Sequence, residues 1–284
     1  MLSAAPITLP GDQRELVIRP PGRWPGIGLR ELFNYRELLY FLTKRELQVR
    51  YKQSIFGVSW AVLQPVSYAF IFALFFGHLA KIPSQGIPYP VFALAGLVPW
   101  MFASQAVGMA SQSLVADANL LSKVFFPRLV LPVSKVLSYT VDLLIATIVL
   151  LGFTFLYGVD WTAGLLLLPF FYGLAGATAL AAGLLFSAVN VKYRDLIVAT
   201  PLIIQLWLFM TPVLYPGTLI TGAWAYIYAL NPMVSVIEGV RWAFLGTPAP
   251  AVGPVAVSCA SVLLGMAVGL YYFRRTERFF ADVV

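Results

Sequence analysis

The stretch LLSKVFFPRLVLPVSK, residues 120–135, carries three cations and two prolines inside a chain that is otherwise nearly uncharged. Asp117 lies just upstream, so four charges fall close together. Burying them in a bilayer would cost on the order of 10 kcal/mol, because each charge at a helix centre costs roughly 2.5 to 3.5 kcal/mol. Pro127 and Pro132 also divide the stretch into short pieces that do not continue a span. The stretch is therefore expected to face water or another protein.

The composition around this stretch is that of an integral membrane protein. Of 284 residues, 60% are apolar and only 11% are charged, whereas soluble domains have about 25% charged residues. Residues 1–28 are rich in Pro, Gly and charge and lack the apolar core of a secretory signal, so they predict a flexible leader. The single cysteine, Cys259, excludes an intrachain disulfide.

The apolar runs predict an all-α membrane protein with six spans. Each run is near the roughly 20 residues that cross a bilayer, and the runs are 58–80, 91–115, 136–157, 161–189, 196–214 and 255–273. Two shorter apolar pieces within 217–250, bounded by Gly, Asn or Pro, predict a re-entrant pair. In the fourth run, Gly173, Ala177 and Ala181 form a ridge of small residues that predicts close helix packing.

Orientation follows from the basic residues. Seventeen of the 19 Lys and Arg residues lie in the N-terminal segment, the second and fourth loops and the tail 274–284, whereas Lys81 and Arg241 lie on the other side. Because basic loops stay in the cytoplasm, both termini and residues 120–135 are expected there. This bias accounts for the net charge of +7 without a nucleic-acid partner.

Residues 29–57 predict an amphipathic helix ahead of the first span. Asn34 can cap it, and Glu37 stands three residues later in the capping-box position. Apolar residues recur at spacings of three and four, at Leu32, Tyr35, Leu39 and Leu42. We expect this apolar stripe to lie on the cytoplasmic membrane surface. The alternative is a helix packed on the protein's own loops.

Few groups offer chemistry of their own. The sequence contains no G-x-x-x-x-G-K-[ST] phosphate loop, so this chain is not expected to hydrolyse ATP by that route. Its one histidine, His78, makes neither a zinc cluster nor a catalytic triad. Asp142 is the clear carboxylate within a span, two turns beyond Lys135. An acid in a membrane is a functional candidate, but this one can also pair with a cation near the interface.

Two further patterns occur in the apolar segments. In the second re-entrant piece Asn231 can cap a short helix, and Glu238 and Arg241 at i and i+3 can pair within it. On the first span, helical spacing relates Trp60, Gln64, Tyr68, Ile71, Phe75 and His78. Such a stripe can line a passage for sugars, whose apolar faces stack on aromatic rings. Packing together with an interfacial aromatic belt is the alternative.

Four blocks resemble the permease subunits of bacterial ABC exporters for lipid-linked polysaccharides, which move O-antigen, capsule or teichoic acid. The blocks are RYKQSIFGVSWAVLQP (50–65), LLSKVFFPRLVLPVSK (120–135), VKYRD (191–195) and LNPMVSVIEGVRWAFLG (230–246). They occur in the expected order, and the resemblance covers nearly all of the chain from about Leu29 onward. It implies a homodimer that works with two copies of a separate ATPase, which would bind ATP and Mg.

The resemblance also implies roles for particular residues. The coupling helix that meets the ATPase would include Ser122, Lys123, Phe125, Phe126, Pro127 and Arg128. The interface helix would include Arg45, Arg50, Tyr51 and Lys52. The channel would be lined by Trp60, Gln64, Tyr68 and Phe75. The outer gate would include Asn231, Glu238, Arg241 and Trp242. No catalytic or metal-binding residue is implied.

Residues 120–135 also have the layout of a docking anchor. Phe125 and Phe126 would enter a pocket of the partner, with Lys123 and Arg128 at its rim. The alternative is a loop whose rings dip into lipid headgroups.

The expected function is export of an undecaprenyl-linked glycan across the bacterial inner membrane. Its rivals are a permease for teichoic acid, a drug or a smaller lipid, a membrane-embedded glycan-modifying enzyme, and a secondary carrier.

Overall fold

The computed structural model describes residues 29–52, 57–124, 126–193 and 195–277, and all regular structure in these ranges is helical. The leader predicted at 1–28 and the tail beyond 277 lie outside the described residues. The elements are α1 (Leu29–Asn34), α2 (Arg36–Tyr51), α3 (Ser59–Phe72), η1 (Ala73–Leu79), α4 (Tyr89–Ala116), α5 (Ala118–Lys123), α6 (Val130–Leu156), η2 (Ala163–Leu167), α7 (Leu168–Lys192), α8 (Asp195–Phe209), η3 (Gly217–Leu219), α9 (Ala223–Tyr228), α10 (Pro232–Leu245) and α11 (Val252–Thr276).

Five helical segments are long and apolar enough to cross a membrane. They are Ser59–Leu79, Tyr89–Ala116, Val130–Leu156, Ala163–Lys192 and Val252–Thr276, which confirms an all-helical membrane protein. The predicted fifth span corresponds to α8, whose 15 residues extend about 22 Å at 1.5 Å per residue. That length is less than the roughly 30 Å hydrocarbon core, so the count of six spans stays a prediction.

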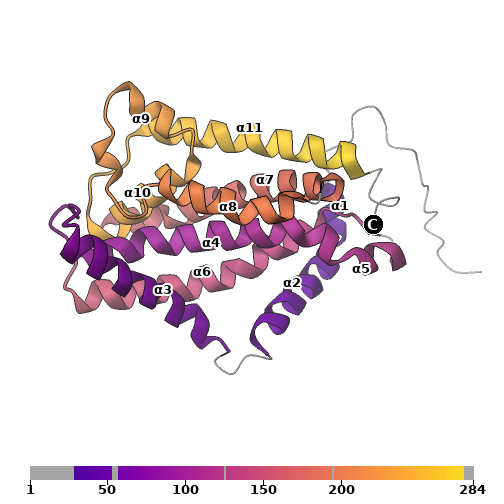
Figure 1. The fold of residues 1–284 in the computed structure, drawn as a ribbon, viewed down its shortest axis with the longest axis horizontal. Coiled ribbons are helices and arrows are strands. Elements are labelled where there is room, and N and C mark those ends of the chain that lie inside the picture. Colours follow the sequence, from indigo (N-terminus) through magenta and orange to yellow (C-terminus); the bar gives the residue numbers. More distant parts are fainter. Residues whose placement is uncertain (1–28, 53–56, 125, 194, 278–284) are drawn as a thin grey trace, which may run out of the picture.

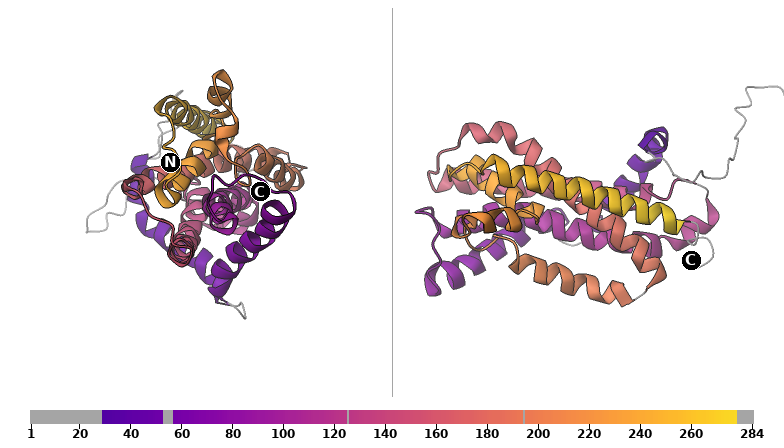
Figure 2. Two further views of the ribbon diagram at one scale, coloured as in Figure 1. Left: turned by 90° about the vertical axis from the view of Figure 1, so that its left-hand side faces the viewer. Right: turned by 90° about the horizontal axis from the view of Figure 1, so that it is seen from above.

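The long helices lie side by side, and the short ones gather at the two ends. In Figure 1, α9 and α10 lie at one end of the bundle, whereas α1 and α5 lie at the other. The end-on view of Figure 2 shows α4 in the middle of the bundle. This helix is the most buried of the five spanning segments, with 78% of its most apolar stretch inside the protein. The two ends therefore carry different short helices, α9 and α10 at one and α1 and α5 at the other (Figure 1).

Small residues allow the closest helix contacts, but not at all the predicted positions. A Cβ at Gly183 of α7 would lie 2.6 Å from the Cβ of Ala110 in α4. A Cβ at Gly269 of α11 would lie 2.8 Å from the carbonyl oxygen of Ala181 in α7. Gly173, by contrast, has open space around its Cβ position. The predicted ridge therefore supports close packing at Ala181 and not at Gly173.

The buried apolar residues form a large core along the bundle and a smaller second core at the α5 end. The second core joins α2, α4, α6, α7 and α11 and contains Leu42, Leu114, Phe126, Leu129, Val130, Leu131, Leu184, Ala188, Val191 and Phe273. α6 begins at Val130, earlier than the predicted span at 136. Pro132 fits in this first turn, where a missing N–H leaves no helical hydrogen bond unmade.

The predicted interface helix is present, but it is oriented differently from the prediction. Asn34 ends α1 and does not cap α2, whose N-cap position is Tyr35 without a side-chain cap. Leu42 is buried in the second core, and Leu32 and Leu39 pack against that core. The apolar stripe therefore faces the bundle, as in the alternative of a helix packed on the protein. Tyr40 and Phe41 are exposed on the outer face.

The end of the first span also departs from the expected pattern. Ala73–Leu79 is a π-helical segment, in which hydrogen bonds run from i to i+5 and each turn holds more residues than an α-helical turn. His78, near the end of this segment, therefore leaves the α-helical face that carries Trp60, Gln64 and Tyr68, whereas Phe75 lies only two residues into it. The predicted aromatic stripe thus departs from α-helical spacing at His78.

Candidate functional site

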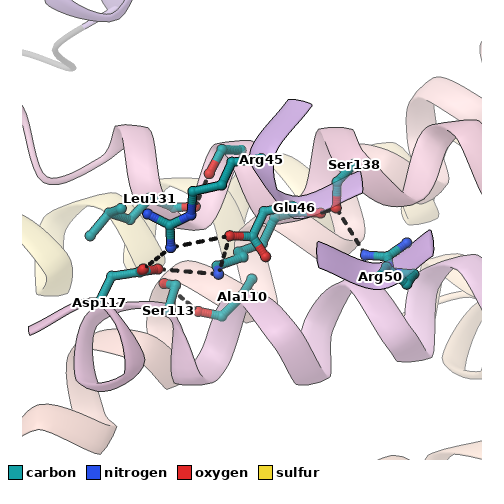
Figure 3. Close-up of polar contacts among 10 residues, drawn as sticks. Arg45, Glu46, Arg50, Ala110, Ser113, Asp117, Leu131 and Ser138 are labelled. Carbon is teal, nitrogen blue, oxygen red and sulfur yellow. Dashed lines mark hydrogen bonds and ion pairs between the residues drawn. The ribbon is translucent and has the colours of Figure 1, made fainter. Parts of the chain in front are cut away.

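A ring of four charged side chains lies where α2 meets the ends of α4 and α6. Arg45 of α2 donates to Oδ1 of Asp117, and Nζ of Lys135 lies 3.1 Å from the other carboxylate oxygen of Asp117. The same Nζ lies 2.8 Å from Oε1 of Glu46, which is 3.6 Å from Arg45. Figure 3 shows Arg45, Glu46 and Asp117 turned toward one another. The ring contains two cations and two anions, so its formal charge is zero.

Three of the four charged side chains of the ring are largely buried, so they need partners of opposite charge. Lys135, Asp117 and Glu46 have side chains only 7%, 8% and 11% exposed. A charge at such depth is costly unless it is paired and hydrogen-bonded. Arg45 is 45% exposed and therefore keeps contact with solvent. Local sequence does not distinguish Glu46 as a functional residue, because a carboxylate on an amphipathic helix is usually a solvated group.

Arg50, one turn further along α2, makes a second link to α6. It donates to Oδ2 of Asp142 and, at 3.1 Å, to the hydroxyl of Ser138. Its guanidinium also lies 3.6 Å from the centre of the Tyr139 ring. Asp142 was expected to pair with a cation near the interface, and the structure identifies that cation as Arg50 rather than Lys135.

A cavity of about 220 Å³ lies beside this second link, between α2, α3, α4 and α6. Its walls are Arg50, Tyr51, Gly57, Trp60, Ala61, Gln64, Pro65, Val98, Met101, Phe102, Gln105, Asp142, Leu143 and Ala146. The amides of Gln105 and Gln64 face each other at 3.5 Å, and the second oxygen of Asp142 is buried without a hydrogen-bond partner. The cavity therefore combines aromatic rings with polar groups that have unused bonding capacity.

The predicted channel residues separate into two groups. Trp60 and Gln64 line the cavity. Tyr68 and Phe75 do not line it, and their side chains are 41% and 53% exposed on the outside of the first span. Lys52 at the end of the interface helix is also exposed. A surface made by Tyr68 and Phe75 would need a second molecule to become a passage.

The structure contradicts the predicted docking anchor at Phe126. The Phe126 side chain is 6% exposed and lies in the second core of its own chain, so it needs no pocket on a partner. Val124 is 52% exposed, and Lys123 is also exposed. Phe125 and the side chain of Ser122 lie outside what the structure describes.

The other end of this loop is fixed to the last helix. Pro127 and Arg128 are half-buried, and Arg128 donates to the backbone carbonyl of Glu277 at the end of α11.

At the opposite end of the bundle, α10 is fixed by a buried arginine. Arg241, 1% exposed, donates to the carbonyls of Tyr215 at 3.0 Å and Val213 at 2.7 Å. It also pairs with Glu238 at 3.2 Å and lies 3.7 Å from the centre of the Phe92 ring. Burial lowers the pKa of the Arg241 guanidinium to about 10, and Glu238 opposes that shift.

The start of α10 is also held by several hydrogen bonds. Asn231 caps the helix by accepting from the N–H of Met233 at 3.2 Å. The same side chain accepts from the Trp207 indole at 3.0 Å and donates to the Thr211 hydroxyl at 2.8 Å. Trp242 is half-buried. The four predicted gate residues therefore belong to a well-anchored helix.

Comparison with known proteins gives a family and several relatives. The family model for the ABC-2 type transporter membrane domain matches residues 37–245. An O-antigen export system permease protein, RfbA of Myxococcus xanthus, is 34% identical over 88% of this chain and 97% of its own length. RfbA of Klebsiella pneumoniae is 28% identical over 87% of this chain and 95% of its own length. The polysialic acid transport protein KpsM of Escherichia coli is 25% identical over 68% of this chain and 76% of its own length.

Proposed function

This chain belongs to the ABC-2 type transporter family, and we propose that it is the membrane subunit of an ATP-driven exporter of undecaprenyl-linked polysaccharide. The observation that carries the proposal is the similarity, over nearly their whole length, to permeases named for O-antigen export. The sequence lacks a phosphate loop, so a separate ATPase subunit would hydrolyse ATP with Mg. This chain itself would carry out no covalent chemistry.

The two ends of the bundle suit two different tasks. The distribution of basic residues favours a cytoplasmic position for the α5 end, where Leu29 begins α1 and Thr276 ends α11 (Figure 1). There the exposed Lys123 and Val124 offer a surface for the ATPase. The α10 end would face outward, where Arg241 anchors the gate helix. In this arrangement ATP-driven movement begins at one end of the bundle, and glycan leaves at the other.

The passage would form between two copies of the chain. Tyr68 and Phe75 are exposed on the first span, and α8 is exposed over most of its length, with Thr200 as its one buried residue. Trp60 and Gln64 at the cavity could stack on a sugar ring and bind its hydroxyls. These features support a passage at the centre of a homodimer, and each copy would bind one ATPase subunit.

Reconstitution tests the proposal. The purified chain would be combined in vesicles with its partner ATPase, and lipid-linked O-antigen-type glycan that reaches the opposite face would be measured. We expect export that requires ATP and stops when the phosphate-loop lysine of the ATPase is replaced. Export of a drug or a smaller lipid, without export of glycan, would overturn the proposal in favour of a different substrate.

A further inference from the structure

The charged ring closes the base of the loop that carries α5. Asp117 is the residue between α4 and α5, since its N–H bonds to the carbonyl of Ser113 and its own carbonyl accepts from Leu120. Lys135 lies in the second turn of α6, after the loop has returned to the bundle. The 3.1 Å contact between Asp117 and Lys135 therefore joins the outgoing and returning stems of the loop.

The same ring fastens α2 to both stems. Arg45 reaches Asp117 on the outgoing stem, and Glu46 reaches Lys135 on the returning stem. These two residues are consecutive on α2, so one point on that helix holds both stems. A displacement of α5 toward or away from the bundle therefore acts on α2 through Asp117.

A second ion pair further along α2 would transmit a displacement of this helix to the cavity. Arg50 lies four residues after Glu46, about 6 Å along the helix, and binds Asp142 of α6. Both Arg50 and Asp142 line the cavity beside Trp60 and Gln64. Because a hydrogen-bonded helix transmits displacement along its axis, α2 connects the base of the α5 loop to the cavity beside the first span.

We infer that Asp117 is a positioning residue for export, which acts as the joint between the α5 loop and α2. The inference rests on the proposed function, because it assumes that the ATPase acts on α5. Of the four ring members, Asp117 is the one that belongs to neither α2 nor α6. Its carboxylate carries the movement without touching the glycan or ATP.

The design of the test follows from the burial of the ring. Asp117→Asn keeps the side-chain shape, and Lys135 keeps its partner Glu46 at 2.8 Å. Arg45, 45% exposed, remains solvated when its partner loses charge. Because no buried charge loses its last partner, both Asp117→Asn and Arg45→Gln are expected to fold. Glu37→Gln and Lys44→Gln on the exposed face of α2 are the matched controls.

The measurement is glycan exported per ATP hydrolysed by the full complex in vesicles. We expect complexes that contain Asp117→Asn or Arg45→Gln to assemble with the ATPase and to hydrolyse ATP at the rate of the unaltered complex, but to export severalfold less glycan per ATP. Arg45→Lys should restore most of the export because it restores the charge. Unchanged export per ATP in both variants, or an equal loss in the controls, would overturn the inference.

A cross-link gives a second measurement that does not depend on these variants. In a Cys259→Ala background, Arg45→Cys with Asp117→Cys removes the ion pair, and a short thiol-specific cross-linker then replaces it. We expect export to be low before cross-linking and to recover after it. Export that stays low after complete cross-linking would overturn the inference that Asp117 acts as a joint. If the unaltered complex hydrolyses ATP and exports no glycan, the proposed function fails instead.

Discussion

Replacing Phe126 tests whether its ring is part of the protein's own core. The side chain is 6% exposed and packs in the second core with residues from five helices. Replacing a buried Phe with Ala typically costs about 3 to 5 kcal/mol, because contacts are lost and a cavity remains. Phe126→Ala should therefore lower the free energy of unfolding by about that amount. A residue that served only to dock a partner would not have this effect.

The assay is thermal unfolding of the purified chain in mild detergent, with Val124→Ala as the matched control. Val124 is 52% exposed in the same loop, so its truncation should change stability by less than about 0.5 kcal/mol. We expect a clearly lower unfolding midpoint for Phe126→Ala and an unchanged midpoint for Val124→Ala. Normal stability of Phe126→Ala together with lost ATPase binding would refute the reasoning and support the interpretation of Phe126 as a docking anchor.

Three further predictions concern the rest of the molecule. Arg241→Ala should destabilise the chain by about 3 to 5 kcal/mol, because it leaves the Glu238 carboxylate without its cation; an unfolding midpoint equal to that of the unaltered chain would contradict this. Trp60→Ala should reduce glycan export per folded protein more than Tyr68→Ala does, because Trp60 lines the cavity and Tyr68 does not; equal export by the two variants in vesicles would count against a role for the cavity. Mass measurement of the active protein in mild detergent should give a dimer, and an active monomer would exclude a passage between two copies.

The sequence alone determined the class of the protein and the position of most spans. Apolar runs of about 20 residues follow directly from the thickness of the bilayer, so five of them coincide with observed helices. The charges of residues 120–135 predict a segment outside lipid because each buried charge is costly, although residues 130–135 form the first turns of the spanning helix α6. These properties depend on local composition, which a single sequence contains. The fifth run corresponds to α8, which is shorter than a standard span.

Only the tertiary structure decided which charges pair and which faces are covered. Asp142 pairs with Arg50, 92 residues away, and Asp117 pairs with Arg45, 72 residues away. Nothing in local spacing distinguishes these partners from Lys135, which lies on the same helix as Asp142.

Only the tertiary structure likewise decided which apolar side chains are buried in the protein's own core. The Phe126 ring and the apolar stripe of α2 were expected to face a partner or lipid, but the fold places them together in one core. An apolar face is stabilised equally by lipid, by a partner or by the chain's own helices. The choice among them depends on contacts between segments far apart in the sequence.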